Sequence, residues 1–166
     1  MGTVTLSPSV YWKGHVGTAI LWYTPLYLWI ATESTTLALF GLLVAVACAP
    51  LPDIDTALPV PHRGPTHTVW FLAGSIVVGS LVGGLLAPTF DVSVLIGVLA
   101  VGGAVGISLT SHVFLDALTP MGIRPFEPVA ATSVSLRLVR SKNPMVNWAL
   151  LIAGCVVLVG GSVSGF

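Results

Sequence analysis

Charged side chains are scarce in this sequence. Six lysines and arginines balance six aspartates and glutamates, and together they make up 7% of its 166 residues. A soluble domain usually carries about 25% charged residues. So few charges cannot cover the surface of a soluble protein of this size. The scarcity excludes a soluble globular domain, a disordered chain and a nucleic-acid-binding protein that relies on a basic patch.

Cysteine is almost absent as well. The two cysteines, Cys48 and Cys155, both lie within apolar runs. They give no sign of a disulfide framework, and their spacing is not that of a zinc knuckle. We interpret them as small apolar packing residues.

Long apolar runs are what the sequence has in abundance. Hydrophobic residues make up 55% of the chain, and the mean hydropathy is +0.98. Runs of about 20 apolar residues are typical of transmembrane helices, and these runs are too continuous for the alternating pattern of a membrane barrel. We therefore expect an all-α integral membrane bundle in a single domain, residues 1–166. About five transmembrane helices are expected, at about 16–31, 35–51, 65–87, 92–118 and 144–163.

The cations all fall on one side of the membrane in this arrangement. They lie before the first helix, between the second and third helices, and between the fourth and fifth helices. Cytoplasmic loops carry an excess of Lys and Arg. The pattern predicts a multi-pass protein of the cell (inner, or plasma) membrane, with its N-terminus in the cytoplasm and its C-terminus outside. The cations are Lys13, Arg63, Arg124, Arg137, Arg140 and Lys142.

The same face is expected to hold all four histidines and most of the aspartates. The orientation was inferred from the cations and not from these residues, so their convergence independently favours a site there. Ionisable groups near a bilayer are costly and tend to be functional. The residues are His15, Asp53, Asp55, His62, His67, His112 and Asp116.

The spacing of two pairs favours metal binding. His112 and Asp116 are four residues apart near the end of a helix, so they share one face and can bind one ion. Asp53 and Asp55 flank one residue, and in an extended segment their side chains point the same way. Imidazole and carboxylate ligands together suit zinc, manganese or iron(II). Taken singly, such residues are also typical of interfacial anchors, solvated turns and hydrogen-bonded pairs.

Arg63 suggests an anion beside the histidines. We expect the third helix to begin at Pro65, and a helix N-terminus next to a guanidinium favours a phosphate group. That phosphate would lie beside His62 and His67. The alternative is that Arg63 only follows the bias of cations toward the cytoplasm.

Four short motifs in this order resemble the YdjM-like family of membrane-bound metal-dependent hydrolases. They are Gly14-His15, Leu51-Pro-Asp-Ile-Asp55, His62-Arg-Gly-Pro-Thr-His67 and Ser111-His-Val-Phe-Leu-Asp-Ala-Leu-Thr-Pro-Met-Gly122. The resemblance implies a metal-dependent hydrolase. That family is in turn distantly similar to zinc-dependent phospholipases C and P1-type nucleases, which act on phosphodiesters. The expected metal ligands are His15, Asp53, His62, His67, His112 and Asp116, with zinc ahead of manganese or iron.

The hypothesis is therefore a membrane-embedded, metal-dependent phosphoesterase whose water is activated at the cytoplasmic face. Asp55 is expected to take the proton and Arg63 to neutralise charge on a phosphoryl oxygen. The opposite assignment, with Asp53 as the base, stays open. Since the site lies at headgroup depth, the expected partners are membrane lipids and a phosphoester that is lipid, lipid-linked or soluble. No nucleic acid is expected.

Two other classes stay open. The metal site could have only a structural or stress-response role, which a closed coordination sphere would favour. The chain could also be a metal-ion transporter, but a pathway should place ionisable residues near the midplane or on both sides. The predicted spans have none there.

Overall fold

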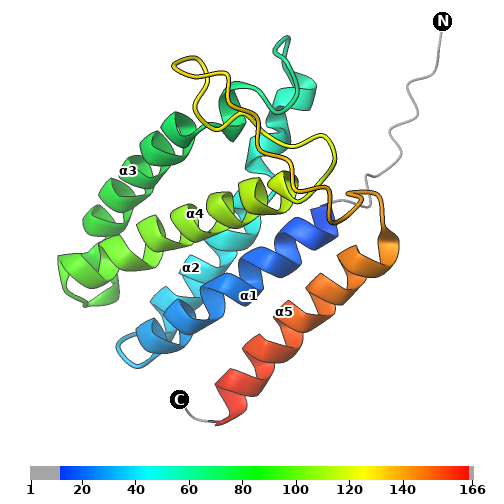
Figure 1. Cartoon of the computed structure of the whole chain (residues 1–166). Helices are drawn as coiled ribbons and strands as arrows, with labels where there is room; N and C mark the ends of the chain where they lie inside the picture. Colours follow the sequence, from blue (N-terminus) through cyan, green and yellow to red (C-terminus); the bar gives the residue numbers. More distant parts are fainter. Residues whose placement is uncertain (1–11, 165–166) are drawn as a thin grey trace, which may run out of the picture.

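The structure is a computed structural model, and it describes residues 12–164 as a bundle of five α-helices (Figure 1). This confirms the predicted all-α membrane bundle. The helices are α1 (Trp12–Ala31), α2 (Thr35–Cys48), α3 (Val69–Leu86), α4 (Val94–Ala117) and α5 (Pro144–Ser164). Three short 3-10 helices lie between them: η1 (Leu51–Ala57), η2 (Pro65–His67) and η3 (Ala87–Phe90).

Three predicted helix boundaries near the site are wrong. The first helix begins at Trp12 and not at about 16, so His15 lies within it. The third helix begins at Val69 and not at Pro65, because Thr68 has an extended backbone and its hydroxyl accepts a hydrogen bond from the Phe71 N–H. The second helix ends at Cys48, and the chain continues as the 3-10 helix η1. The Asp53 and Asp55 segment is therefore helical and not extended, so their side chains leave the backbone in different directions.

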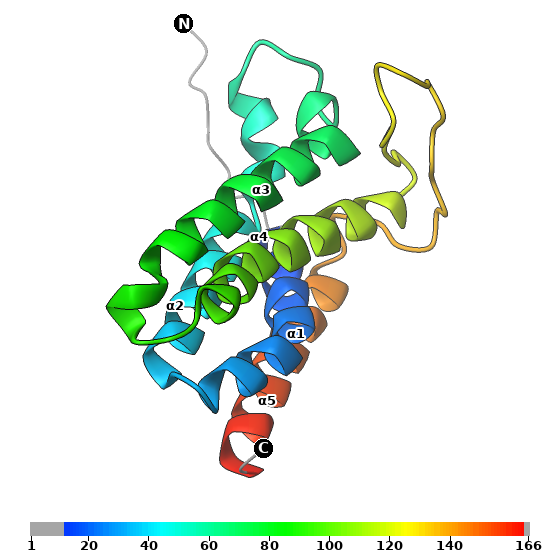
Figure 2. The ribbon, with the colours of Figure 1, turned by 90° about the vertical axis from the view of Figure 1, so that its left-hand side faces the viewer.

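Helix α1 is covered by protein on most of its sides, although Trp22 and Trp29 remain exposed. It packs against α2, α4 and α5, whereas α3 packs mainly along α4 (Figures 1 and 2). Four segments are long and apolar enough to cross a membrane: α2 with η1, α3 with η3, α4, and α5. The more polar α1 is not among them. Its buried hydroxyl groups are satisfied inside the bundle, as when Tyr23 donates to the Ala100 carbonyl.

Glycines allow close approach of the backbones where helices cross. Gly83 of α3 lies against the backbone of Gly97 of α4, where a Cβ atom would collide with the carbonyl group. Gly17 of α1 and Gly154 of α5 make a similar contact. Small residues at helix interfaces are the usual means of packing helices in lipid, where the hydrophobic effect does not drive them together.

The polar residues gather at one end of the bundle, which we call the site end. Helices α1, α3 and α5 begin there, and α2 and α4 end there. The two long connections, residues 49–68 and 118–143, cover this end. The short connections that carry Glu33 and Asp91 lie at the opposite end.

The expected orientation is tested by reporter fusions. Alkaline phosphatase, which is active only outside the cytoplasm, should be active when fused after Glu33 and inactive when fused after Arg137. The reason is the bias of cations toward the cytoplasmic side. Equal activity at both positions would contradict the arrangement of the helices, and inverted activities would contradict only the orientation.

Candidate metal centre

Four side chains from three elements meet at the site end. Asp53 comes from η1, His67 from η2, and His112 and Asp116 from the last turns of α4. One donor atom from each lies within 4.8 Å of the donor atoms of the others. His67 Nε2 is 3.2 Å from Asp116 Oδ2 and 3.8 Å from Asp53 Oδ1. His112 Nε2 is 3.5 Å from each of the same two oxygens.

Three of these donor atoms are buried without a hydrogen-bond partner. They are His67 Nε2, His112 Nε2 and Asp116 Oδ2. A buried polar atom without a well-formed hydrogen bond is costly, and these three contact one another only as ion pairs of 3.2 and 3.5 Å. Ligands about 2.0–2.1 Å from a tetrahedral ion lie roughly 3.3–3.4 Å apart. The observed separations match that spacing, so these residues fit a divalent metal ion.

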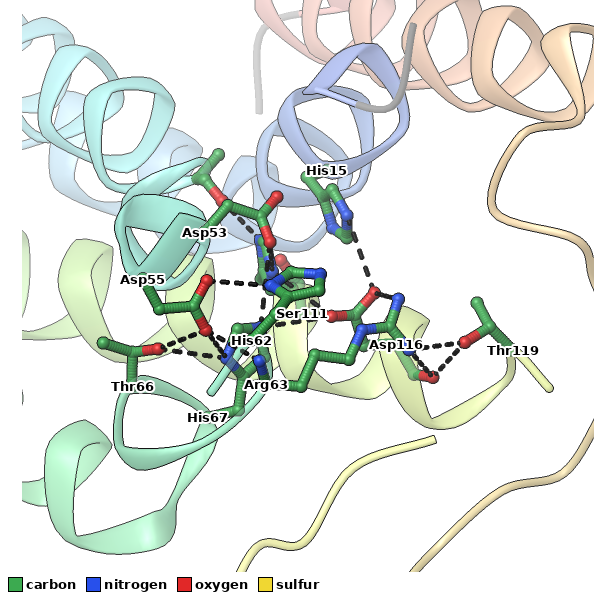
Figure 3. A network of polar contacts seen from close by, with 12 residues as sticks. His15, Asp53, Asp55, His62, Arg63, Thr66, His67, Ser111, Asp116 and Thr119 are labelled. Carbon is green, nitrogen blue, oxygen red and sulfur yellow. Dashed lines mark hydrogen bonds and ion pairs between the residues drawn. The ribbon is translucent and has the colours of Figure 1, made fainter. Parts of the chain in front are cut away.

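The outer nitrogens of both histidines are held by the protein. His112 Nδ1 lies 2.7 Å from the Ala49 carbonyl, so Nδ1 carries a proton and donates, and in the neutral ring Nε2 is the nitrogen that can bind a metal ion. His67 Nδ1 lies 3.4 Å from Asp55 Oδ2 and 3.1 Å from the Thr66 hydroxyl. Partners of this kind fix the tautomer and the ring orientation of a metal-binding histidine. Figure 3 shows the Asp55, Thr66 and His67 part of this network.

Asp55 lies outside the four-residue cluster. Its side chain is buried, and both oxygens accept hydrogen bonds. His62 Nδ1 lies 2.8 Å from Oδ1, while the Arg63 N–H and the Thr66 hydroxyl donate to Oδ2 at 2.7 and 3.1 Å. The expectation that Asp53 and Asp55 point the same way is wrong, because two steps of a 3-10 helix turn the side chains well apart. The geometry favours a positioning role for Asp55.

Arg63 is bound to Asp116. Its Nη2 donates to Asp116 Oδ1 at 2.7 Å, and its Nη1 donates to the Thr119 hydroxyl at 2.7 Å and to the Gly122 carbonyl at 3.1 Å. This pairing occupies Oδ1 of Asp116 and leaves Oδ2 facing the cluster. The helix N-terminus that was expected beside Arg63 is not there, since α3 begins at Val69. The guanidinium therefore orients a candidate ligand and ties the end of α4 to the following loop.

His15 and His62 lie next to the cluster but outside it. The His15 ring stacks on His112, with centroids 3.7 Å apart, and its Nε2 is 3.9 Å from Asp116 Oδ1. His62 also forms a group with Asp53 and Asp55 whose donor atoms lie within 4.8 Å. Its Nδ1 is only 2.8 Å from Asp55, however, which is a hydrogen-bond distance and shorter than the spacing of two ligands on one ion.

A polar cavity of about 470 Å³ adjoins the cluster. It reaches the surface, since the side chain of His62 is 40% exposed and that of Asp53 is 33% exposed. Two cations, Arg63 and Lys142, border it together with the two candidate ligands Asp53 and Asp116. The remaining lining residues are His15, Thr56, His62, Met121 and Ser141.

Comparison with known families gives a match along almost the whole chain. The model of the family described as YdjM inner membrane protein matches residues 11–165. The chain belongs to the YdjM family. No curated protein and no solved structure matches it.

Membership in the YdjM family makes this a multi-pass inner membrane protein, in agreement with its apolar helices. The matched region contains every residue of the cluster. The supporting roles of Thr66 and Thr119 were not predicted from the sequence. The only signal was their position, since Thr66 lies within the His62–His67 motif and Thr119 within the Ser111–Gly122 motif.

Replacing Asp55 with asparagine should weaken metal binding without removing a ligand. The change removes the carboxylate charge that supports His67 and His62 and places an amide among their hydrogen-bond donors. Loss of a residue that holds a metal ligand in place typically lowers metal affinity or activity by about 10–100-fold. Metal titration of the chelator-treated protein measures this. Asp91→Asn, at the opposite end of the bundle, is the control and should bind as the native chain does. An unchanged affinity in Asp55→Asn would show that Asp55 does not support the centre.

Proposed function

We propose that this YdjM-family protein is a membrane-embedded, metal-dependent hydrolase that cleaves a phosphoester at the cytoplasmic face. The observation that carries the proposal is the set of three buried donor atoms that have no hydrogen-bond partner and face one point beside an open polar cavity. Buried histidines and a carboxylate arranged in this way suit a divalent ion. The open cavity gives that ion contact with water and with a substrate.

The residues that would hold the ion are Asp53, His67, His112 and Asp116. Zinc fits this mixture of nitrogen and oxygen donors, and manganese and iron(II) are the alternatives. When bound, such an ion supplies Lewis-acid chemistry, which polarises a phosphoryl oxygen and makes water a stronger nucleophile. Among the four residues, Asp53 is the one that borders the cavity with a partly exposed side chain, so its carboxylate has room to shift when a substrate enters.

The cavity favours an anionic ester. Arg63 and Lys142 border it, and since the charge of Arg63 is balanced by Asp116, a divalent ion held by the four-residue cluster would supply the further positive charge. A phosphate group meets complementary charge in such a cavity. The position of the cavity, at the end of apolar helices and below a loop that carries cations, corresponds to the headgroup region of a bilayer. The lipid, lipid-linked and soluble phosphoesters expected from the sequence all remain within this class.

His62 is the residue best placed to move the proton. Asp55 holds its Nδ1 at 2.8 Å, so the other ring nitrogen is left to serve the cavity that His62 borders. An acidic residue that fixes the tautomer of a histidine in this way is typical of general acid–base catalysis. In hydrolysis the water oxygen bonds to phosphorus and gives its proton to His62, while the ester P–O bond on the opposite side of phosphorus breaks and the departing oxygen takes a proton from solvent. This assignment replaces Asp55, whose two oxygens are both engaged.

A non-catalytic metal site is the second candidate function. Four protein donors around one point is also the arrangement of a closed structural site. In that case the metal would only hold η1 and η2 against α4. Transport fits less well, because the described helices carry their histidines and charged residues at the site end and none in their middle.

Metal-dependent hydrolysis tests the proposal against this alternative. Purified protein is treated with a chelator, reloaded with zinc, manganese or iron(II), and assayed on p-nitrophenyl phosphate, bis-p-nitrophenyl phosphate and anionic phospholipids. The proposal predicts turnover in the reloaded protein only, and its loss in Asp53→Ala. A protein that binds one equivalent of metal but cleaves none of these three kinds of ester would instead have a structural site.

A further inference from the structure

A second, smaller cavity reaches the metal centre from the side of the bundle. It lies between the last turn of α4 and the first two turns of α5 and has a volume of about 50 Å³. We call it the side slot. Most of its wall is apolar and comes from Leu115, Leu118, Val139, Val146 and Leu150. Its remaining residues include His15, Asp116 and Ser141, and these three also line the polar cavity.

The side slot exists because α5 packs on α1 and makes little contact with α4. In Figure 1, α1 lies between α4 and α5, so the outer parts of these two helices are left apart. The segment before α5 closes the slot toward the loops. That segment is held in place by Asn147, whose amide donates to the Ser141 carbonyl at 2.9 Å and to the Asn143 carbonyl at 2.8 Å.

The surroundings of the side slot are those of a bilayer. On α4 the neighbouring Phe114 is 45% exposed, and on α5 Met145 and Trp148 are 80% and 47% exposed. Apolar side chains at the surface of a membrane-spanning helix face lipid. The exposed Arg140, which also borders the slot, lies at the end of the bundle where headgroups are expected.

We propose that the side slot binds the first part of a hydrocarbon chain of the substrate, which enters laterally from the bilayer. The inference rests on the proposed function. Two cavities of opposite character share His15, Asp116 and Ser141 in their walls, and we take this shared wall as their meeting point. An amphiphilic phosphoester places its charged group at the meeting point, its polar part in the 470 Å³ cavity and its chain in the slot. A water-soluble ester has no part that would use an apolar slot next to the metal centre.

The substitution that tests this is Val146→Trp, which fills the side slot without changing any residue of the cluster. The matched control is Val78→Trp, a change of equal size on α3. Val78 lines an apolar groove between α2 and α3 that shares no residue with the metal centre. Both variants are reconstituted in bilayer nanodiscs, and their metal content and thermal stability are measured. If Val146→Trp does not fold, Leu150→Trp takes its place.

Pairs of esters that differ only in chain length give the first readout. The pairs are hexadecyl phosphate with ethyl phosphate, and hexadecyl p-nitrophenyl phosphate with ethyl p-nitrophenyl phosphate. Each buried methylene changes binding about fourfold, so loss of two methylene contacts predicts a fall of roughly fifteenfold in kcat/KM for the long-chain ester. The ethyl ester should change by less than about twofold, and Val78→Trp should change neither. Equal effects of Val146→Trp on both esters, or no effect on either, would overturn the inference.

A second readout does not depend on activity. A hexadecyl phosphate that carries a diazirine near the phosphate end is cross-linked to the chelator-treated protein in nanodiscs, and the labelled residues are identified by mass spectrometry. The inference predicts label on the wall of the side slot, and its loss in Val146→Trp. Label spread evenly over the lipid faces of α3 and α5 would overturn it. Slot labelling in a protein that cleaves no ester would support a lipid site while the proposed hydrolase fails, so the two outcomes are distinguishable.

Discussion

His112→Ala should abolish stoichiometric metal binding. The imidazole is fully buried, its Nδ1 is tied to the Ala49 carbonyl, and its Nε2 faces the cluster without another partner. Alanine leaves three metal-binding residues in the cluster and an empty space in the interior of the bundle beside α4. Metal that binds the folded state contributes to folding, by about 4 kcal/mol when its concentration is a thousand times its dissociation constant. The native protein should therefore lose thermal stability on chelation, and the variant should show no such change.

The comparison of chelated and loaded protein separates the two effects of His112→Ala. The cavity left by the lost ring destabilises both forms alike, whereas the metal contribution appears only in their difference. Ser111→Ala is the control. Its hydroxyl is equally buried but donates only to the Ser108 carbonyl of its own helix. One equivalent of bound metal in His112→Ala, with the native response to chelator, would exclude His112 as a ligand.

His62→Ala should retain the metal and lose activity. His62 borders the polar cavity and pairs with Asp55, but it lies outside the four-residue cluster. General acid–base catalysis is worth roughly 10²–10⁴-fold, so the rate of ester hydrolysis should fall by that factor. Metal analysis and single-turnover hydrolysis of the loaded variant measure the two quantities separately. Loss of metal in His62→Ala would make His62 a ligand, as the sequence analysis expected.

Rescue by added imidazole distinguishes proton transfer from a structural role. The polar cavity has a volume of about 470 Å³, and removal of the His62 ring enlarges it next to Asp55. Imidazole in solution should therefore restore part of the activity of His62→Ala. Met121→Ala, which enlarges the same cavity without removing a proton carrier, should show no dependence on imidazole. A His62→Ala variant with native activity would exclude His62 from catalysis.

The fold could be predicted from the sequence because apolar runs in a membrane protein leave few choices. The five helices follow from composition and from the length of the apolar runs. The central place of α1 was not predictable in this way. It depends on packing against α2, α4 and α5 and on contacts such as the hydrogen bond from Tyr23 to the Ala100 carbonyl, which joins residues far apart in the sequence.

The candidate site was predicted as a set of residues, but their division into roles was not. Spacing correctly joined His112 and Asp116, because a long helix fixes the relation of positions four residues apart. It failed for Asp53 and Asp55, since the backbone after α2 turns into a 3-10 helix that no strong local signal marks. Arg63 was expected to face an anion. Its pairing with Asp116 depends on the way the 49–68 connection folds over the end of α4, which is a tertiary contact.

X-ray absorption spectroscopy of the zinc-loaded protein tests the central claim most directly. The account predicts two imidazole nitrogens at about 2.0–2.1 Å, with carboxylate oxygens at about 2.0–2.2 Å and no sulfur at about 2.3 Å. His112→Ala should lose bound zinc or, at high zinc concentration, show one imidazole fewer. A spectrum with sulfur ligands, or one with oxygen ligands and no imidazole, would contradict the metal centre formed by Asp53, His67, His112 and Asp116.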